Sequence, residues 1–489
     1  MRKIVALLLV IAAANLSTRA QTKDPNTWDL RRCIEYAMAN NISVKQADVQ
    51  ARVSAVILKQ SKLQQIPSLN YSLQHGANFG RSLDRTTNVY TDLSGTFQQM
   101  NLSSQATIFN FNSQKNTIKA NDFAYQADQA AIEKARNDIG LNVAQRYLVI
   151  LLDIETSRVN EIQMKTSQNQ LNNTRKLVQA GSLPELNVAE LETQVARDSA
   201  TYVASITTIE LDKLTLKGLM NLPADAPFNL ETPPVETIPV DNILEEKPEI
   251  IYAMAMQTQP QIKVNNLRLL ASQKNYDATK GRLYPTLSAF GNLNTQFQVG
   301  FKSIGAVPGG YFKTQGYAQD PNNAANQFPV YAQSFSTVQT PNKFGALWDG
   351  YWKTLGDNFG QNVGLAVSVP IFNGWQARSN VARSKLDIEN KSLTVEQDTL
   401  KLKQDVYSAY NLAYGAFQTF EARKKALEVA QRSFDLASKR YEIGVMQTID
   451  WIINQNALYT AAVNALYAQF DYVFKMKVLE YYKGQGLRL

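Results

Sequence analysis

Two stretches of 68 residues, 113–180 and 376–443, contain no proline and only one interior glycine each. Each is followed by a glycine, Gly181 or Gly444, the residue type that most often ends a helix. A fully helical stretch of this length would measure about 100 Å at ~1.5 Å per residue, several times the length of a typical globular helix. A fold that holds two such helices needs other elements of matching length beside them.

The two stretches belong to two copies of one unit. Ile108-Phe109-Asn110 recurs 263 positions later as Ile371-Phe372-Asn373, and the segment 176–181 recurs in a weaker form at 439–444 with the same offset. Ordered matches at a fixed offset indicate an internal two-fold repeat. We therefore predict a first repeat at 21–220, a proline-rich connector at 221–247 and a second repeat at 248–489.

Each repeat is predicted to run helix, strand, strand, long helix, helix. Alternation of apolar and polar residues predicts the strands, as where Leu69 and Tyr71 alternate with Asn70 and Ser72. The first repeat has a helix at 28–65, strands at about 68–79 and 100–109, a long helix at 113–180 and a helix at 185–220. The second has a helix at 249–282, strands at about 286–297 and 361–370, a long helix at 376–443 and a helix at 448–482. Its 45 additional residues fall at 298–360, an aromatic-rich stretch predicted to be a long ordered loop.

The four strands have the length and pattern of membrane-spanning β-strands. Such a strand needs ~9–11 residues, with one apolar and one polar face. The polar faces here carry Ser, Asn, Gln and Gly with few charges, and aromatic residues gather at the strand ends. A half-exposed sheet of a soluble protein is the alternative. His75 falls on the apolar face, which predicts either a local bulge at Gly76 or a position near the membrane interface.

The short helices of each repeat add up to roughly the length of one long helix. Helices 28–65 and 185–220 together hold 74 residues, and helices 249–282 and 448–482 together hold 69. Stacked end to end, they would form columns as tall as the long helices. Apolar residues lie on several faces of the long helices, as in a wall that packs on two sides, whereas a two-stranded coiled coil would show sustained heptads.

Four strands cannot close a barrel. An open sheet in hydrocarbon leaves two edges of unpaired backbone groups, each costing several kcal/mol, and pairing between copies removes them. Two copies give eight strands with a filled interior, and three give twelve with room for a lumen. We therefore predict an α+β membrane protein: a trimeric 12-stranded antiparallel β-barrel, with four strands per chain, continued by a long α-helical barrel.

Composition limits the chemistry. Arg2 and Lys3, the apolar run that follows and Ala20 predict a signal peptide at 1–20. One histidine and one cysteine exclude the ordinary zinc and iron ligand sets, so we expect no metal and no cofactor. The net charge of +8 is spread without a basic block, which argues against nucleic acid as a partner. No P-loop, HExxH or GxSxG motif occurs, so we expect no catalytic residues and no enzyme activity.

The chain resembles the TolC-like outer-membrane efflux protein family over essentially its whole mature length. The resemblance rests on Trp28-Asp29-Leu30, on the junction Pro370-Ile371-Phe372-Asn373-Gly374, on Gly181 and Gly444 at the helix turns, and on the duplicated architecture. It implies a homotrimer in the outer membrane, with its helical part in the periplasm, that acts as a passive exit duct for small molecules such as drugs and toxic compounds. The implied partners are outer-membrane lipid, a periplasmic adaptor protein and an inner-membrane pump of the RND or ABC type.

Other functions stay open at this point. A type I protein secretion system uses the same kind of duct, because the pump rather than the duct selects most of the cargo. A trimeric structural or adhesive surface protein would also have long helices, but it would not need two strand-loop-strand units. A dedicated porin would need more strands and little helix.

The resemblance also implies a gate at the second helix turn. Tyr441 matches a constricting tyrosine, and Asp450 matches an aspartate of an acidic ring at the periplasmic aperture. Met446, Asn187 and Ile453 fall where the family has an arginine, its acidic partner and a second aspartate, so the closing network is absent in that form. From the residues alone, Tyr441 is interpreted as a packing residue and Asp450 as a favoured acid in the first turn of a helix. Adaptor docking is implied along the turns 175–187 and 438–450, at Gly181, Ser182, Leu183, Gly444, Val445 and Met446.

Overall fold

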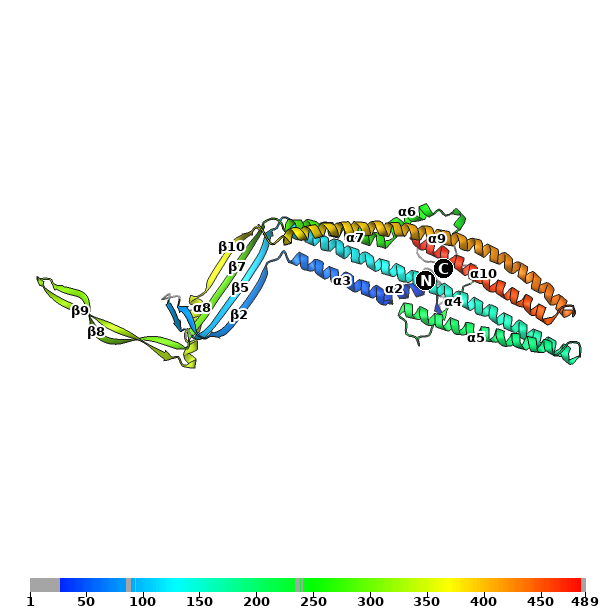
Figure 1. The fold of residues 1–489 in the computed structure, drawn as a ribbon, viewed down its shortest axis with the longest axis horizontal. Helices are drawn as coiled ribbons and strands as arrows, with labels where there is room; N and C mark the ends of the chain where they lie inside the picture. The colour runs from blue at the N-terminus through cyan, green and yellow to red at the C-terminus, as the bar shows by residue number, and fades with distance from the viewer. Residues whose placement is uncertain (1–26, 85–88, 93, 234–237, 239–240, 485–489) are drawn as a thin grey trace, which may run out of the picture. The chain divides into compact units, whose positions relative to one another are not determined.

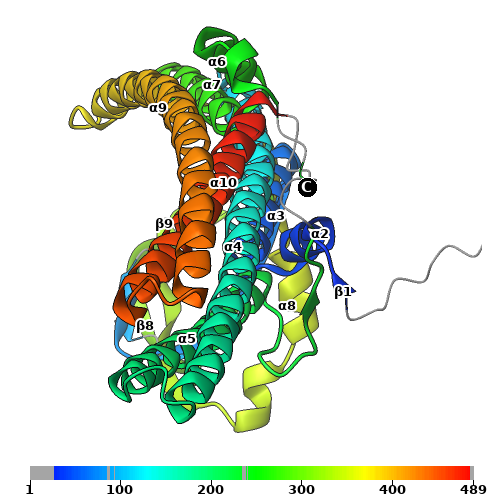
Figure 2. The same ribbon diagram turned by 90° about the vertical axis from the view of Figure 1, so that its right-hand side faces the viewer.

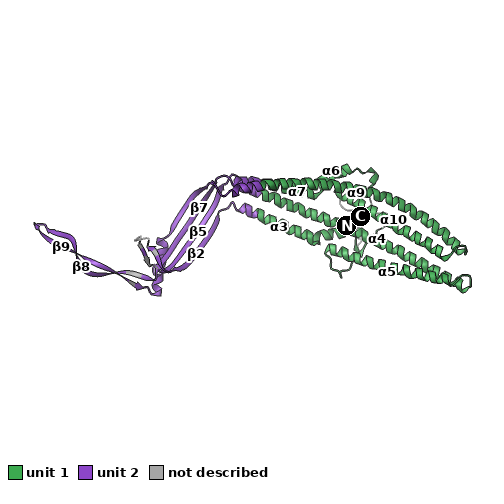
Figure 3. Cartoon of the chain, in the orientation of Figure 1, with its two compact units in different colours: residues 1–58, 119–275, 384–489 green, residues 59–118, 276–383 purple. Residues whose placement is uncertain are grey.

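The computed structural model describes residues 27–84, 89–92, 94–233, 238 and 241–484, so the predicted signal peptide at 1–20 lies outside the described residues. The chain divides into two compact units (Figure 3). The helical unit contains the described residues up to 58, residues 119–275 and those from 384 onward, and the sheet unit contains residues 59–118 and 276–383. The predicted α+β class is confirmed.

Helices make up most of the described chain (Figure 1). In the helical unit α4 runs antiparallel to α5, and α9 runs antiparallel to α10 (Figure 2). Among the described residues, no helix combines the length and the apolar character needed to cross a membrane. The helices are α2 (Leu30–Asn40), α3 (Ile42–Leu63), α4 (Ser113–Gln179), α5 (Leu186–Met220), α6 (Pro248–Thr258), α7 (Pro260–Gly281), α9 (Gln376–Glu442) and α10 (Thr448–Lys483).

A single helix is predicted at 28–65 and another at 249–282, but the structure has two helices in each of these stretches. Between α2 and α3, Asn41 leaves the helical conformation (φ −59°, ψ 137°), and its side-chain Oδ1 accepts a hydrogen bond from the amide of Ser43, 2.8 Å away. Between α6 and α7, Gln259 is extended because it precedes Pro260, which disfavours helical backbone at the residue before it.

Both breaks are fastened in the same way, and they lie 218 residues apart. Asn41 Nδ2 donates to the carbonyl of Leu219, 2.7 Å away, near the end of α5. Gln259 Nε2 donates to the carbonyl of Tyr481, 3.2 Å away, near the end of α10. The Asn41 side chain therefore satisfies a carbonyl near the end of α5, whereas Gln259 adds a second donor to the Tyr481 carbonyl, which also accepts from the amide of Gly484 at 3.1 Å.

A core around α2, α4 and the end of α5 holds the middle of the helical unit. Cys33 and Ala37 are fully buried there beside Tyr147, whose hydroxyl donates to the carbonyl of Glu231 at 2.6 Å. Burial raises the pKa of the Cys33 thiol to about 12. The only cysteine of the chain is therefore an inert packing residue.

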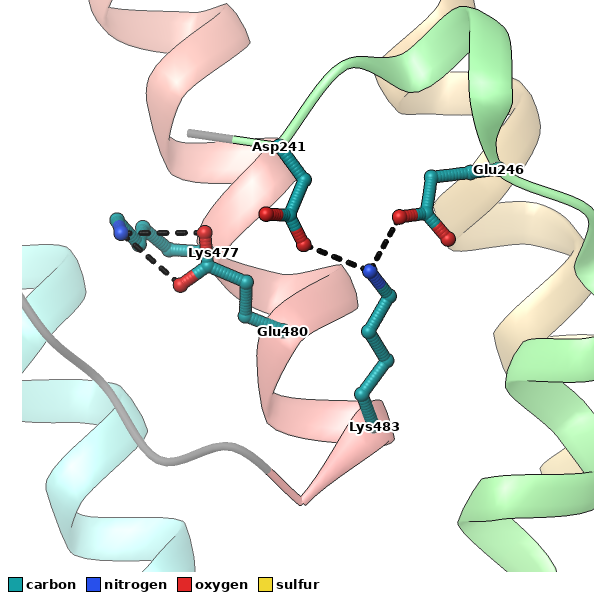
Figure 4. A network of polar contacts seen from close by, with 5 residues as sticks. All are labelled: Asp241, Glu246, Lys477, Glu480 and Lys483. Carbon is teal, nitrogen blue, oxygen red and sulfur yellow. Dashed lines mark hydrogen bonds and ion pairs between the residues drawn. The ribbon is translucent and has the colours of Figure 1, made fainter. Parts of the chain in front are cut away.

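The connector at 221–247 is fastened to the end of α10 by ion pairs (Figure 4). Lys483 Nζ lies 2.7 Å from Asp241 Oδ2 and also bonds Glu246 Oε1. Nearby, Lys477 Nζ lies 2.9 Å and 3.1 Å from the two carboxylate oxygens of Glu480. The Lys477 and Lys483 side chains are only 4% and 7% exposed, so their charges need these partners.

The sheet unit is built on four antiparallel strands in the order β10-β7-β5-β2. Every neighbouring pair is in continuous register except for a bulge in β5 between Thr107 and Phe109. His75 pairs with Gln98 and Gly76 with Phe97, so there is no bulge at Gly76. The strands are β2 (Ser68–Asn78), β5 (Gly95–Phe109), β7 (Thr286–Gly300) and β10 (Gly360–Ser368).

The long loop predicted at 298–360 is largely regular structure. Most of it is a hairpin of two 19-residue strands, β8 (Lys302–Asp320) and β9 (Asn323–Pro341). A short 3-10 turn, η3 (Phe344–Trp348), and helix α8 (Tyr351–Asp357) follow. The aromatic residues of this stretch predict ordered structure. The glycine and proline residues between them interrupt the apolar-polar alternation, so the two strands could not be predicted from the sequence.

Candidate functional site

One face of the four-stranded sheet is polar and almost without charge. Asn70, Ser103, Asn292 and Asn362 stand side by side in one row across all four strands. The neighbouring row is formed by Ser72, Asn101, Asn294 and Gly360. Small amides and hydroxyls at this density suit a surface in contact with water.

The opposite face is apolar and exposed in the single chain. Leu69, Ser104, Gly291 and Val363 form one row, and Leu365 pairs with Ala289 in the next. Val363 is 86% exposed. A row of exposed aliphatic side chains along whole strands needs an apolar environment, because water would disfavour it by about 25 cal/mol per Å².

The sheet has two free edges. β2 and β10 each pair on one side only, within the part of the chain that the structure describes. Their outer edges therefore carry backbone amides and carbonyls that need partners from another chain if the sheet lies in hydrocarbon.

Each returning strand enters its long helix through the same backbone conformation. Two consecutive residues have positive φ angles at each junction: Phe111 and Asn112 (49° and 61°), and Gly374 and Trp375 (62° and 65°). A left-handed conformation costs about 1–2 kcal/mol for a non-glycine residue. Ring packing supports it at the first junction, where Phe111 lies 4.7 Å from Tyr284 and 5.0 Å from Phe109 between ring centroids.

Both helix turns are closed by the same hydrogen bonds. Gly181 and Gly444 each have a φ of +73°, and nothing would touch a Cβ atom at either residue. The amides of Ser182 and Val445 donate back to the carbonyls of Leu177 (2.9 Å) and Arg440 (3.0 Å), which is the Schellman pattern. Glycine is therefore required for its backbone angle, and the turn exposes apolar residues, namely Leu177, Leu186, Ile443, Val445 and Ile449.

The structure places Tyr441 inside the chain. Its side chain is buried beside Trp451, and its hydroxyl oxygen lies 3.2 Å from Thr174 Oγ1 and 3.0 Å from Thr448 Oγ1. These contacts join α4, α9 and α10 near the turns. Met446 packs against the same apolar cluster.

The other residues of the predicted gate lie apart from that cluster. Asp450 is exposed in the first turn of α10, and Ile453 is exposed one turn further on. Asn187 is half-buried at the start of α5. Within one chain, the structure therefore brings together Tyr441 and Met446 but not Asp450 and Asn187.

Sequence analysis missed a buried polar network between the two helical hairpins. Ser167 Oγ donates to Asp198 Oδ2 at 2.6 Å, and Gln194 Nε2 donates to Asp198 Oδ1 at 2.9 Å. Gln455 Nε2 donates to Ser167 Oγ at 2.9 Å, which connects α10 to α4 and α5. A buried carboxylate with these donors fixes how the hairpins pack above the turns. The only sequence signal for this network was the presence of polar residues on otherwise apolar helix faces.

The carboxyl group of Asp153, elsewhere in the helical unit, is poised to titrate. Asp153 lies beside Asp212, whose Oδ1 is 3.1 Å from Arg146 Nη1. Burial, and then the neighbouring Asp212, raise the pKa of Asp153 to about 7. Asp153 therefore changes charge near neutral pH.

Asp153→Asn is expected to raise the melting temperature at pH 8 and to change it little at pH 4. A carboxyl group whose pKa is raised by folding favours the folded state at low pH, and this contribution is lost between about pH 4 and pH 7. The amide mimics the protonated acid, so it removes a cost that grows across that range and is complete only above it. Thermal unfolding at both pH values checks this, and equal stabilisation at both would contradict it.

Solved outer-membrane channels share this fold. The crystal structure of CusC is 14% identical, with 96% of this chain and 95% of that chain covered and a TM-score of 0.72. CmeC of Campylobacter jejuni is 16% identical (94% and 86% covered, TM-score 0.69), and VceC of Vibrio cholerae is 13% identical (94% and 97% covered, TM-score 0.71). No curated protein sequence matches the chain.

A sequence family also matches the chain. Residues 33–221 and 352–474 match the family described as outer membrane efflux protein, which is more than half of the chain. The matched segments include both helix turns and the strands β2, β5 and β10. Members of this family are channel proteins rather than enzymes. The chain therefore belongs to the outer membrane efflux protein family, and it is a protein of the cell outer membrane.

Proposed function

We propose that three copies of this chain form the outer-membrane exit duct of a tripartite efflux system. The observation that carries the proposal is the four-stranded sheet, with one uncharged polar face, one exposed apolar face and two free edges. Pairing β10 of one copy with β2 of the next would satisfy both edges. Three copies would close twelve strands, with the polar face inside and the apolar face toward lipid.

The Asn, Gln and Ser rows would then line a lumen for small molecules. Side chains without charge neither trap ions nor bind a cargo of one sign, which suits a passive duct for drugs and toxic compounds. The helical unit would continue the wall into the periplasm, because α4 and α9 enter directly from the returning strands. Two repeats in each of three copies would supply the helical pairs of that wall.

The helix turns are the proposed docking surface for a periplasmic adaptor, which would connect the duct to an inner-membrane pump of the RND or ABC type. Leu186, Ile443 and Val445 expose large apolar side chains at the turns, where a chain acting alone would gain by burying them. Gly181, Ser182, Leu183, Gly444, Val445 and Met446 form the turns themselves.

The aperture is proposed to lie at the α9–α10 turn. Asp450 is exposed there, and three copies would bring three such carboxylates around one axis. Tyr441 would act from inside the chain, where its hydroxyl ties the α9–α10 hairpin to α4. Met446 and Asn187 replace the charged pair that the resemblance implies, so apolar packing around Met446 would contribute to closure.

Conductance in a planar bilayer tests the duct. The purified protein is expected to give discrete channels, and Asp450→Ala is expected to lower their preference for cations over anions, because a ring of carboxylates attracts cations. Asp471→Ala is the matched control, since Asp471 is an exposed acid further along α10 that pairs with Lys475. No channels at all would reject the duct, whereas unchanged selectivity would leave Asp450 as a helix-start acid.

A further inference from the structure

The segment 343–358, which contains η3 and α8, folds back onto the sheet after the β8–β9 hairpin (Figure 1). Gln98 Nε2 donates to the hydroxyl of Tyr351 at 2.7 Å, and Thr295 Oγ1 donates to the carbonyl of Leu355 at 2.6 Å. Asn358 Nδ2 also donates to the carbonyl of Gln296 at 2.8 Å. Within the segment, Leu347 and Leu355 are buried. The segment is therefore firmly attached at this end of the sheet.

The register shows which face the segment covers. His75, Gln98 and Phe297 stand in one row across β2, β5 and β7, on the same side as Leu293 and the rest of the apolar face. The Trp348 ring stacks on His75 and on Phe297, with centroids 5.8 Å and 6.0 Å apart. The segment thus lies on the apolar face and not on the polar one.

The segment covers the part of the apolar face in which polar residues interrupt the apolar pattern. His75, Gln98 and Thr295 interrupt the apolar pattern, and each of them contacts the segment. Beyond them, toward the long helices, the face continues with exposed apolar residues, namely Leu69, Tyr71, Leu73, Val363, Leu365 and Val367. The segment therefore marks the level at which the strands stop presenting a purely apolar surface.

The outward side of the segment carries two large aromatic rings and two lysines, together with two exposed acids, Asp349 and Asp357. Phe344 and Trp352 are 79% and 81% exposed, and Lys343 and Lys353 are exposed next to them in sequence. Large aromatic rings beside lysines are typical of the membrane interface, where a ring is partly buried and an amine reaches phosphate groups. In water alone, this arrangement would leave most of the surface of both rings exposed, although the Trp352 ring also contacts the Tyr351 ring, with centroids 5.1 Å apart.

We propose that segment 343–358 is an interfacial anchor, which lies against the outside of the barrel at the level of the outer-leaflet headgroups and inserts Phe344 and Trp352 among them. The inference rests on the proposed function, because it requires the apolar face to face lipid. The partner is the lipid surface itself. The anchor would fix the depth of the barrel in the membrane and would shield Gln98, which is buried beneath it, from lipid.

Tryptophan fluorescence tests the depth of the anchor. Four of the five tryptophans, Trp28, Trp348, Trp375 and Trp451, are replaced with phenylalanine in the full chain, which leaves Trp352 as the reporter. The trimer is reconstituted in phosphatidylcholine vesicles that carry a quencher either on the headgroup or deep in the acyl chain. The headgroup quencher is expected to act at least about twofold more strongly than the deep one.

Two further variants make the outcome specific. A chain that keeps only Trp451, which is buried in α10, should resist both lipid quenchers. A chain without native tryptophans but with Leu365→Trp reports on the middle of the apolar face, and there the deep quencher should act more strongly. If the chain that keeps only Trp352 does not fold, the unaltered protein is compared with its Trp352→Phe variant. The part of the emission that lipid quenchers reduce in the former and that is missing in the latter then reports on Trp352.

The outcomes separate the anchor from the duct. Quenching of the Leu365→Trp reporter by deep lipid, without lipid quenching of Trp352, overturns the anchor and leaves the barrel standing. Shielding of Trp352 from both lipid and aqueous quenchers would mean that protein covers it, which also overturns the anchor. Absence of lipid quenching at Leu365→Trp rejects the membrane-facing sheet, and the anchor with it.

Discussion

Leu365→Arg is expected to destabilise the membrane-inserted protein by about 2–4 kcal/mol per copy, which is the cost of a basic residue on the lipid face of a barrel near the midplane. Leu365 lies in the middle of β10, paired with Ala289, and is 67% exposed on the apolar face. In a trimer the cost is incurred three times, so assembly should largely fail. Urea titration of the protein in lipid vesicles measures the change.

Ala366→Arg is the matched control for that variant. Ala366 is the next residue in β10 and lies on the polar face, opposite Ser288. Its arginine would extend into the lumen, so stability should change little while single-channel conductance and ion preference change clearly. Equal loss of stability in the two variants would contradict the assignment of the two faces.

Lys483→Ala is expected to lower the free energy of unfolding by about 2–4 kcal/mol and to release the connector. The substitution leaves Asp241 and Glu246 without their shared cation, and breaking a buried ion pair costs about 3–5 kcal/mol. The lower range applies because the Asp241 side chain is 45% exposed and keeps part of its hydration. Thermal unfolding and limited proteolysis within the connector measure the two effects.

Lys475→Ala provides the comparison on the same helix. Lys475 pairs with Asp471 one turn away, and both side chains are partly exposed, so its removal should cost only about 0.3–0.5 kcal/mol. Proteolysis of the connector should not change. If the two lysine variants behaved alike, the network around Lys483 would not be what fastens the connector.

The fold class and the family could be predicted from local patterns in the sequence. Alternation predicts which residues face each side of a strand, and the absence of proline predicts the long helices: the stretch proposed at 376–443 contains α9 at Gln376–Glu442. The repeat offset also located the extra segment of the second repeat. These features depend on neighbouring residues, which is why one sequence suffices to read them.

Features that depend on distant residues could not be predicted. The break at Asn41 needs the end of α5 as a partner, and the one at Gln259 needs the end of α10, although Pro260 was a visible signal. The network of Ser167, Asp198 and Gln455 joins residues 31 and 288 positions apart. His75 was ambiguous because its neighbour, Trp348, comes from a segment whose return onto the sheet no local pattern encodes.

The proposed duct requires that three copies satisfy one another's free sheet edges. Native mass spectrometry of the full chain, extracted from membranes in mild detergent, tests this directly. A trimer joined through its sheet edges predicts a single dominant species with the mass of three chains, and it predicts that Leu365→Arg, but not Ala366→Arg, depletes that species. A dominant mass of one chain or of two chains would contradict it.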